Sequence, residues 1–294
     1  MRLIRKAGAQ IALREDRYTM ADGRELLLLK FPLLEESGIV RHCFTTRRGG
    51  ISEGIFAELN LSFTRGDERE AVEENYRRLS AALDVEYEKF VLTDQTHTVN
   101  VRKVSAADAG KGLTRERNYR DVDGLITDEP GLVLSAFFAD CVPLYFVDPI
   151  HRAIGLSHSG WRGTVCRMGR ATIEAMKEAY GTQPKDLVCA IGPSICQDCY
   201  EVGEDVAEEF RRAFPDCWQE LAVPSLKPKE ETGGEQKYQL DLWRANERVL
   251  LDAGVAPDQI AVTDICTCCN PEVLFSHRAS HGKRGNLGAF LSLK

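Results

Sequence analysis

Long apolar stretches are missing from this sequence of 294 residues. No run approaches the ~20 apolar residues that a membrane-spanning helix needs, so we expect no membrane segment. The first residues also lack a continuous apolar core and a small-residue cleavage site, which argues against a secretory signal. An excess of positive charge is missing too. The 38 basic and 45 acidic residues give a formal charge of −7, which argues against a nucleic-acid-binding surface.

Internal repeats are absent, and so is a strict βαβ alternation of strands and helices. Apolar residues make up 43% of the chain and charged residues 28%, as in ordinary globular proteins. The mixture of strand-like and helix-like segments predicts one α/β domain of the mixed α+β kind, a mixed sheet with flanking helices. Four helices are expected, at residues 67–83, 165–180 (capped by Thr164), 204–214 and 241–253. Residues 224–237, rich in Pro, Gly and charge, predict a surface loop.

Ten cysteines are scattered through apolar segments, which indicates reduced thiols and a cytoplasmic protein rather than a disulfide framework. Cys196 and Cys199 have the spacing of metal ligands. Cys266 and the adjacent pair Cys268-Cys269 lie far downstream, and we do not take them as a matching pair. A structural zinc there is therefore the lesser expectation.

The chain is organised around residues 133–164. Two apolar runs, 142–147 and 153–156, flank a turn at residues 148–151. If residue 148 pairs with residue 151, Cys141 faces His158 across a hairpin, with Cβ atoms about 5 Å apart. Val142 then pairs with Ser157 on the opposite face of the sheet.

His97 is a third candidate, because it lies in a polar stretch, residues 93–98, that interrupts the strand-like pattern of residues 90–104. Such an interruption indicates a turn or a site. Two imidazoles and a thiolate suit Zn²⁺ with a fourth position left for water. Cys141 and His158 alone suit a thiol–imidazole pair for nucleophilic catalysis. A buried thiol beside a core histidine is the third alternative.

Copper ranks behind zinc. A His₂Cys set also suits a type 1 copper site. A multicopper oxidase, however, needs several His-x-His pairs, and none occurs among the six histidines. A separate anion site is possible at Arg47, Gly49 and Gly50, where backbone N–H groups follow fixed positive charge. On this motif alone, a plain glycine turn with solvated arginines is the favoured interpretation.

Several motifs in order then show a resemblance to the YfiH/YlmD family, also called laccase-domain or polyphenol oxidase proteins. The motifs, which together are highly specific, are Phe44-Thr45-Thr46-Arg47-x-Gly49-Gly50, Asp94-Gln95-Thr96-His97, Asp123-Gly124-Leu125-Ile126-Thr127, Ala139-Asp140-Cys141-x-Pro143, His158-Ser159-Gly160-Trp161-Arg162-Gly163-Thr164, Gly192-Pro193-x-Ile195 and Tyr200-Glu201-Val202-Gly203. The resemblance begins near residue 40, so residues 1–40 form a less characteristic extension of a single domain spanning residues 1–294.

The resemblance implies a YfiH-like fold, related in architecture to Cys/His toxin deamidases. It implies a zinc site at His97, Cys141 and His158. It also implies purine nucleoside chemistry: phosphorolysis of adenosine, inosine, guanosine and methylthioadenosine, and deamination of adenosine. Purine nucleosides and phosphate would then be the small-molecule partners.

From these expectations we assign roles. A metal-bound water would attack C6 of adenosine, with Asp140 as the proton carrier. Arg47 with Gly49 and Gly50 is the first choice for phosphate binding, and Arg162 the second. Trp161 or Tyr145 could stack on the purine, although both suit core packing. Alternatives are a metal-free Cys/His hydrolase or deamidase, a copper-dependent phenol oxidase and a non-enzymatic zinc-binding protein.

Overall fold

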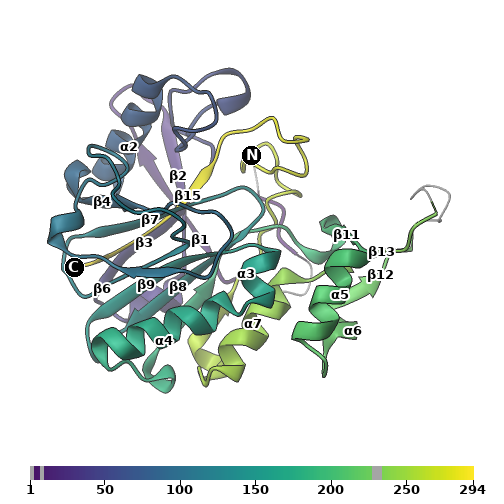
Figure 1. Cartoon of the computed structure of the whole chain (residues 1–294). Coiled ribbons are helices and arrows are strands. Elements are labelled where there is room, and N and C mark those ends of the chain that lie inside the picture. The colour runs from purple at the N-terminus through teal and green to yellow at the C-terminus, as the bar shows by residue number, and fades with distance from the viewer. Residues whose placement is uncertain (1–2, 7–9, 227–233) are drawn as a thin grey trace.

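The computed structural model describes residues 3–6, 10–226 and 234–294. Two six-stranded sheets pack face to face, and helices cover both outer faces (Figure 1). The predicted mixed α/β class is confirmed, with two large mixed sheets where the sequence suggested one. Within the described residues, no helix has the length and apolar character required to cross a membrane.

A strand from the C-terminal part of the chain, β15, lies near the centre of the first sheet. In spatial order its strands are β1 (Arg14–Thr19), β2 (Glu25–Lys30), β3 (Val40–Thr45), β15 (Leu287–Leu293), β7 (Val133–Phe138) and β4 (Phe90–Leu92). Neighbouring strands are antiparallel except β4 and β7, which are parallel. Residues 14–30 of the predicted N-terminal extension thus supply one edge of this sheet.

The second sheet is built around the predicted hairpin. In spatial order its strands are β14 (Ile260–Val262), β10 (Val188–Ile191), β8 (Val142–Asp148), β9 (Ala153–Ser159), β6 (Gly124–Thr127) and β5 (Val101–Lys103). A small antiparallel sheet stands apart and comprises β11 (Glu201–Gly203), β13 (Lys237–Leu240) and β12 (Ala222–Pro224).

The helices divide between the two outer faces (Figure 1), except α1, whose Leu34 packs in the layer between the sheets. The helices are α1 (Pro32–Glu36), α2 (Arg69–Leu83), α3 (Trp161–Val165), α4 (Met168–Tyr180), α5 (Glu204–Ala213), α6 (Trp218–Leu221) and α7 (Leu242–Asp252). Helix α2 covers the first sheet through Val72, Tyr76 and Leu79. Helices α4 and α7 cover the second sheet. Between the sheets, residues such as Leu134 and Leu156 form a fully buried apolar layer.

The hairpin forms, but its predicted register is wrong by two residues. Val142 pairs with Ser159 instead of Ser157, and Asp148 pairs with Ala153. The loop therefore comprises residues 149–152, and the Asp148 carboxylate accepts hydrogen bonds from the N–H groups of Ile150 and His151. Since side chains alternate along a strand, a shift of two keeps every residue on its predicted face.

The helix predicted at residues 165–180 is two helices. Arg167 has a left-handed backbone, φ 60°, which separates α3 from α4. Thr164 lies inside α3, where its hydroxyl donates to the Gly160 carbonyl, so it does not cap the longer helix. Of the loop predicted at residues 224–237, residues 227–233 lie outside the described residues.

Candidate metal centre

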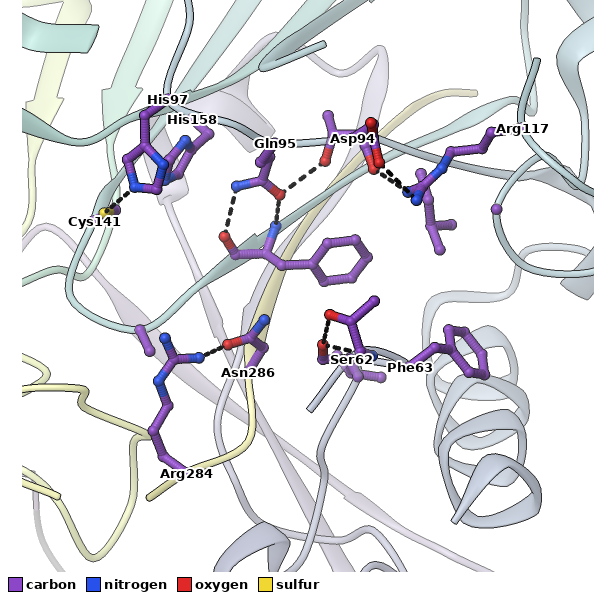
Figure 2. A pocket seen from close by; sticks show the side chains of 17 residues that line it. Ser62, Phe63, Asp94, Gln95, His97, Arg117, Cys141, His158, Arg284 and Asn286 are labelled. Carbon is purple, nitrogen blue, oxygen red and sulfur yellow. Dashed lines mark hydrogen bonds and ion pairs between the residues drawn. The ribbon is translucent and has the colours of Figure 1, made fainter. Parts of the chain in front are cut away.

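The chain crosses from the first sheet to the second twice in one region. Residues 93–100 connect β4 to β5 and carry His97, so the polar interruption in the sequence marks this crossing. Residues 139–141 connect β7 to β8 and carry Cys141, while His158 lies on β9. The ligand atoms of the three side chains all lie within 4.8 Å of one another. Figure 2 shows the three side chains together. The structure thus brings the three predicted metal ligands together.

Close packing gives this cluster its shape. The Sγ atom of Cys141 lies 3.9 Å from Nε2 of His97, and the ring centroids of His97 and His158 are 4.9 Å apart. His97 has φ 67°, a left-handed conformation that a non-glycine residue adopts only when its surroundings enforce it. A Cβ atom on Gly160 would lie 3.1 Å from the sulfur, so glycine leaves room for the cluster.

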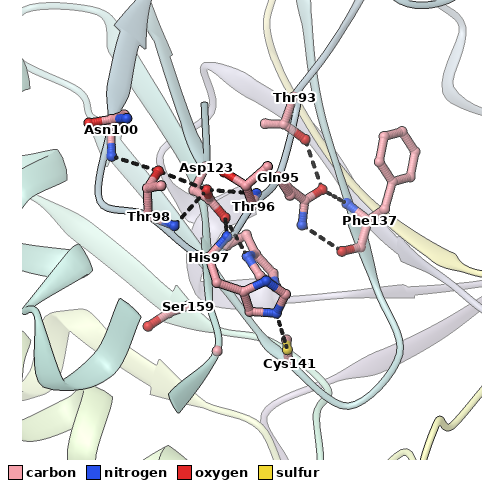
Figure 3. A network of polar contacts seen from close by, with 12 residues as sticks. Thr93, Gln95, Thr96, His97, Thr98, Asn100, Asp123, Phe137, Cys141 and Ser159 are labelled. Carbon is pink, nitrogen blue, oxygen red and sulfur yellow. Dashed lines mark hydrogen bonds and ion pairs between the residues drawn. The ribbon is translucent and has the colours of Figure 1, made fainter. Parts of the chain in front are cut away.

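Asp123 provides the enforcing contacts. Its Oδ1 atom lies 2.7 Å from Nδ1 of His158 and accepts from the N–H of His97 at 3.1 Å. Its Oδ2 atom accepts from the N–H groups of Thr96 and Thr98 and from the Thr98 hydroxyl (Figure 3). One buried carboxylate therefore fixes the His97 loop and the His158 ring together, and it leaves Nε2 of His158 to face the cluster.

The electrostatics of the cluster favour a thiolate. Burial raises the pKa of the Cys141 thiol. The charge of His158 and hydrogen bonds from both histidines outweigh this effect, and the pKa falls from 9.0 to about 6. Burial lowers the pKa of His158, while Cys141 and Asp123 raise it to about 9. For Asp123, burial raises the pKa and the bond to His158 outweighs that effect, which brings it to about 2. A deprotonated sulfur is the form that ligates a metal.

The Gln95 side chain fixes the same crossing. Its amide exchanges two hydrogen bonds with the backbone of Phe137, at 2.7 and 2.8 Å, as a neighbouring strand would (Figure 3). Asp94 forms an ion pair with Arg117 at 2.7 Å. Two polar residues of the Asp94–His97 motif thus support the loop, while His97 supplies the ligand.

A cavity of about 350 Å³ opens beside the cluster. Its walls include His97, Cys141 and His158 on one side and Arg284 and Asn286 on another (Figure 2). Aromatic rings from two more residues, Phe63 and Phe137, also line it. Its size falls in the range of small-molecule sites.

Arg284 brings positive charge into the cavity. Its Nη1 atom donates to Asn286 Oδ1 and Gly285 O, while its buried Nε–H finds no hydrogen-bond partner among the described residues. Burial, followed by the charge of Arg65, lowers its pKa to about 10, so the group stays charged at neutral pH. A half-buried guanidinium that lines a cavity is a suitable contact for an anionic ligand.

The Arg47–Gly50 segment lies elsewhere. Arg47 donates to the carbonyls of Ala57 at 2.6 Å and Pro271 at 2.9 Å, and it does not line the cavity. The N–H of Gly49 donates to the Glu58 carboxylate at 2.8 Å. The predicted concavity therefore already binds an anion, the side chain of Glu58.

Asp140 and Arg162 flank the cluster without lining the cavity. Asp140 has φ 89°, and its oxygens accept from the Thr267 hydroxyl and the N–H of Arg278, both at 2.7 Å. Arg162 is exposed at the start of α3 and stacks 4.2 Å from the centre of the Trp161 ring. Tyr145 is fully buried and donates to Cys43 O, so it packs in the core.

Sequence reasoning missed the roles of Asp123 and Arg284. Asp123 directly precedes the buried strand β6, and a carboxylate at the end of a core strand is a recognisable signal. Arg284 gave no such signal, because it belongs to a polar tail whose path back to the cavity depends on the tertiary fold.

Comparison with known proteins places the fold in a family. Residues 41–294 match the family described as multi-copper polyphenol oxidoreductase laccase. Purine nucleoside phosphorylase YlmD of Bacillus subtilis is 36% identical over 85% of this chain and 87% of its own. Adenosine deaminase RL5, from an unknown prokaryotic organism, is 32% identical over 80% and 87%.

The crystal structure of hypothetical protein YfiH of Bacillus licheniformis superposes with a TM-score of 0.84 at 32% identity, and it covers 91% of this chain and 96% of that one. The chain therefore belongs to the YfiH/YlmD family, whose model carries the multi-copper polyphenol oxidoreductase laccase description.

Proposed function

We propose that this protein is a zinc-dependent purine nucleoside enzyme. It would cleave adenosine, inosine, guanosine and methylthioadenosine with phosphate and would also deaminate adenosine. The convergence of His97, Cys141 and His158 on one wall of a ligand-sized cavity carries this proposal. The names of the two curated relatives, a purine nucleoside phosphorylase and an adenosine deaminase, support the substrate class.

The donor set fits zinc. Three protein ligands that face a cavity are typical of catalytic zinc sites, which keep one position open. The carboxylate of Asp123 on the far nitrogen of His158 is the usual support of such a histidine. Zinc bound there would supply Lewis acidity and would lower the pKa of a bound water. A multicopper mechanism would need more histidines than the six in the chain provide.

The cavity walls suggest how a nucleoside would lie. Phe63 and Phe137 offer apolar surface for a purine ring. The Arg284 guanidinium, which lines the cavity, would hold the phosphate in phosphorolysis. The phosphate-binding role of Arg47, Gly49, Gly50 and Arg162 stays a prediction, as does proton transfer by Asp140. The contacts of Asp140 favour a second role for it, the positioning of Cys141.

Adenosine incubated with and without phosphate tests the proposal. Phosphorolysis yields adenine and ribose 1-phosphate only when phosphate is present. Deamination yields inosine and ammonia in both samples, and with phosphate part of this inosine should be cleaved further to hypoxanthine and ribose 1-phosphate. Removal of metal with a chelator should abolish both products, and added zinc should restore them. A Cys166→Ser variant, which changes an exposed thiol outside the cluster, is the matched control for Cys141→Ser. No product from either sample would leave a non-enzymatic zinc-binding protein.

A metal-free hydrolase or deamidase is the second candidate, because Cys141, His158 and Asp123 are also arranged as nucleophile, base and orienting carboxylate. Alkylation of Cys141 distinguishes the two. Under the zinc hypothesis, a chelator should accelerate alkylation, since it frees the sulfur. Equal rates with and without chelator, together with chelator-resistant turnover, would favour the thiol mechanism.

A further inference from the structure

A second group of sulfur atoms lies outside the site described above. Cys196 and Cys199 come from the segment around a short 3-10 helix, Gln197–Cys199, and Cys266 and Cys269 from the segment after β14. Their four Sγ atoms all lie within 4.8 Å of one another. Cys266 and Cys269 are three residues apart, so the two segments contribute matching Cys-x-x-Cys pairs. The sequence analysis overlooked the second pair because Cys268 lies within it.

The sulfur–sulfur distances are those of a metal site. Cys199 and Cys269 are 3.5 Å apart, and Cys196 and Cys269 are 4.0 Å apart. A tetrahedral zinc with Zn–S bonds of about 2.3 Å places its sulfurs about 3.8 Å apart. A disulfide would need about 2.05 Å, and all four thiols are free.

The surroundings suit negative sulfur. The N–H of Cys196 points at Sγ of Cys266 at 3.2 Å, and the Lys6 ammonium, which forms an ion pair with Asp198 at 2.7 Å, lies beside Cys196. Four thiolates and one divalent ion carry a net charge of −2, which an adjacent ammonium and N–H donors partly offset. Cys196 and Cys266 are only 2% and 1% exposed, which closes the site to solvent on their side.

We propose that Cys196, Cys199, Cys266 and Cys269 bind a structural zinc ion, separate from the ion of the candidate active site. A closed Cys₄ set leaves no open position and is typical of zinc that stabilises a fold. Zinc binding would displace the thiol protons, and the binding free energy would add to stability.

The ion would fasten segments that hold the active site. Ser194 and Cys266 form a backbone bridge, which joins the two cysteine segments. The N–H of Ile195 donates to the Asp140 carbonyl, and the Thr267 hydroxyl donates to the Asp140 carboxylate. Asp140 precedes the proposed ligand Cys141. The Cys₄ site would therefore position one ligand of the other metal through its neighbour.

Metal analysis of protein purified without a histidine tag tests this proposal independently of the proposed function. A His97→Ala/Cys141→Ser double variant removes the first site. In this background we expect about one zinc per chain to remain. Adding Cys199→Ser should remove it, whereas adding Cys268→Ser, a neighbouring thiol outside the group, should not.

Cobalt provides a readout that does not need the Cys199 variant to fold. The chelator-stripped double variant should bind about one Co²⁺ with the intense visible bands of a tetrahedral thiolate site. Chelator should also lower its melting temperature. A folded double variant that holds no metal and gives no such spectrum overturns the proposal. So does a mass measurement that finds these cysteines as disulfides in freshly purified protein.

Discussion

The Oδ1 atom of Asp123 lies 2.7 Å from Nδ1 of His158, and the same carboxylate accepts three backbone N–H groups of the His97 loop. The two candidate histidine ligands are thus held by one buried side chain. Asp123→Asn keeps the shape but removes the charge and half of the acceptor capacity. Loss of such a support typically weakens metal binding about 10- to 100-fold. Chelator competition, with zinc content as the readout, measures this loss.

Asp128→Asn is the matched control, because Asp128 follows β6 on the exposed surface, where it lies 3.9 Å from Lys103. It should bind zinc as the wild type does. Equal zinc affinity in Asp123→Asn and Asp128→Asn would contradict the orienting role of Asp123.

Arg284 should contribute to phosphate binding in phosphorolysis and should have little effect on adenosine deamination. A hydrogen bond to a charged group contributes about 1.5–3 kcal/mol, so Arg284→Gln should raise the phosphate KM of phosphorolysis about 10- to 100-fold. Adenosine deamination, which consumes no phosphate, should change little. Steady-state kinetics at varied phosphate check this, with Arg170→Gln, a surface residue paired with Glu174, as the control. If Arg47→Gln raised the phosphate KM and Arg284→Gln did not, the original prediction for Arg47 would stand.

His42 should make the fold sensitive to acid. Burial, followed by the charges of Lys30 and Arg14, lowers its pKa from 6.5 to about 3. Its Nε2 accepts from the N–H of Phe31, so the folded protein needs the neutral ring. The stabilisation is complete above pH 6.5 and is lost as the pH falls toward 3, by about 1.4 kcal/mol per pH unit.

Urea unfolding at pH 7 and pH 5 measures this dependence. The wild type should lose about 2 kcal/mol more than His42→Gln between these pH values. Identical losses would show that protonation of His42 does not contribute.

Gly50 should tolerate no side chain. A Cβ atom there would lie 2.3 Å from the Glu58 carbonyl and 2.5 Å from Leu59 Cα, and backbone cannot move aside easily. Gly50→Ala should cost about 3 kcal/mol in the free energy of unfolding. Gly163→Ala, where the nearest atom lies at 3.5 Å within helix α3, should change it by less than about 1 kcal/mol. A mild effect at Gly50 would contradict this account of the packing around it.

The local patterns predicted the site better than the fold. The hairpin, the polar interruption at residues 93–98 and the alternation of side chains were enough to bring His97, Cys141 and His158 together. The hairpin register failed because the side chain of Asp148 organises a longer turn, which sequence spacing does not reveal. The prediction of one continuous helix at residues 165–180 was wrong because Arg167 adopts a left-handed backbone, which its residue type does not indicate as a glycine would.

Long-range placement was beyond the sequence. Nothing in residues 90–104 indicates that β4 and β5 belong to different sheets, since both segments are equally strand-like. The arginines show the same limit. Arg47 and Arg284 have similar sequence surroundings, and the tertiary fold decides their different contacts. Arg47 donates hydrogen bonds to two backbone carbonyls, whereas Arg284 lines the cavity.

The central strand of the first sheet is synthesised after every other strand of that sheet. β15 lies between β3 and β7 and pairs with both along most of its length, for example through Ala289 with Phe44 and Ala136. A nascent chain on the ribosome must therefore carry β3 and β7 with unsatisfied edges until residues 287–293 emerge. Such edges invite aggregation. We expect the newborn protein to rely on chaperones, and stalled translation products that lack these residues to become targets of proteolysis.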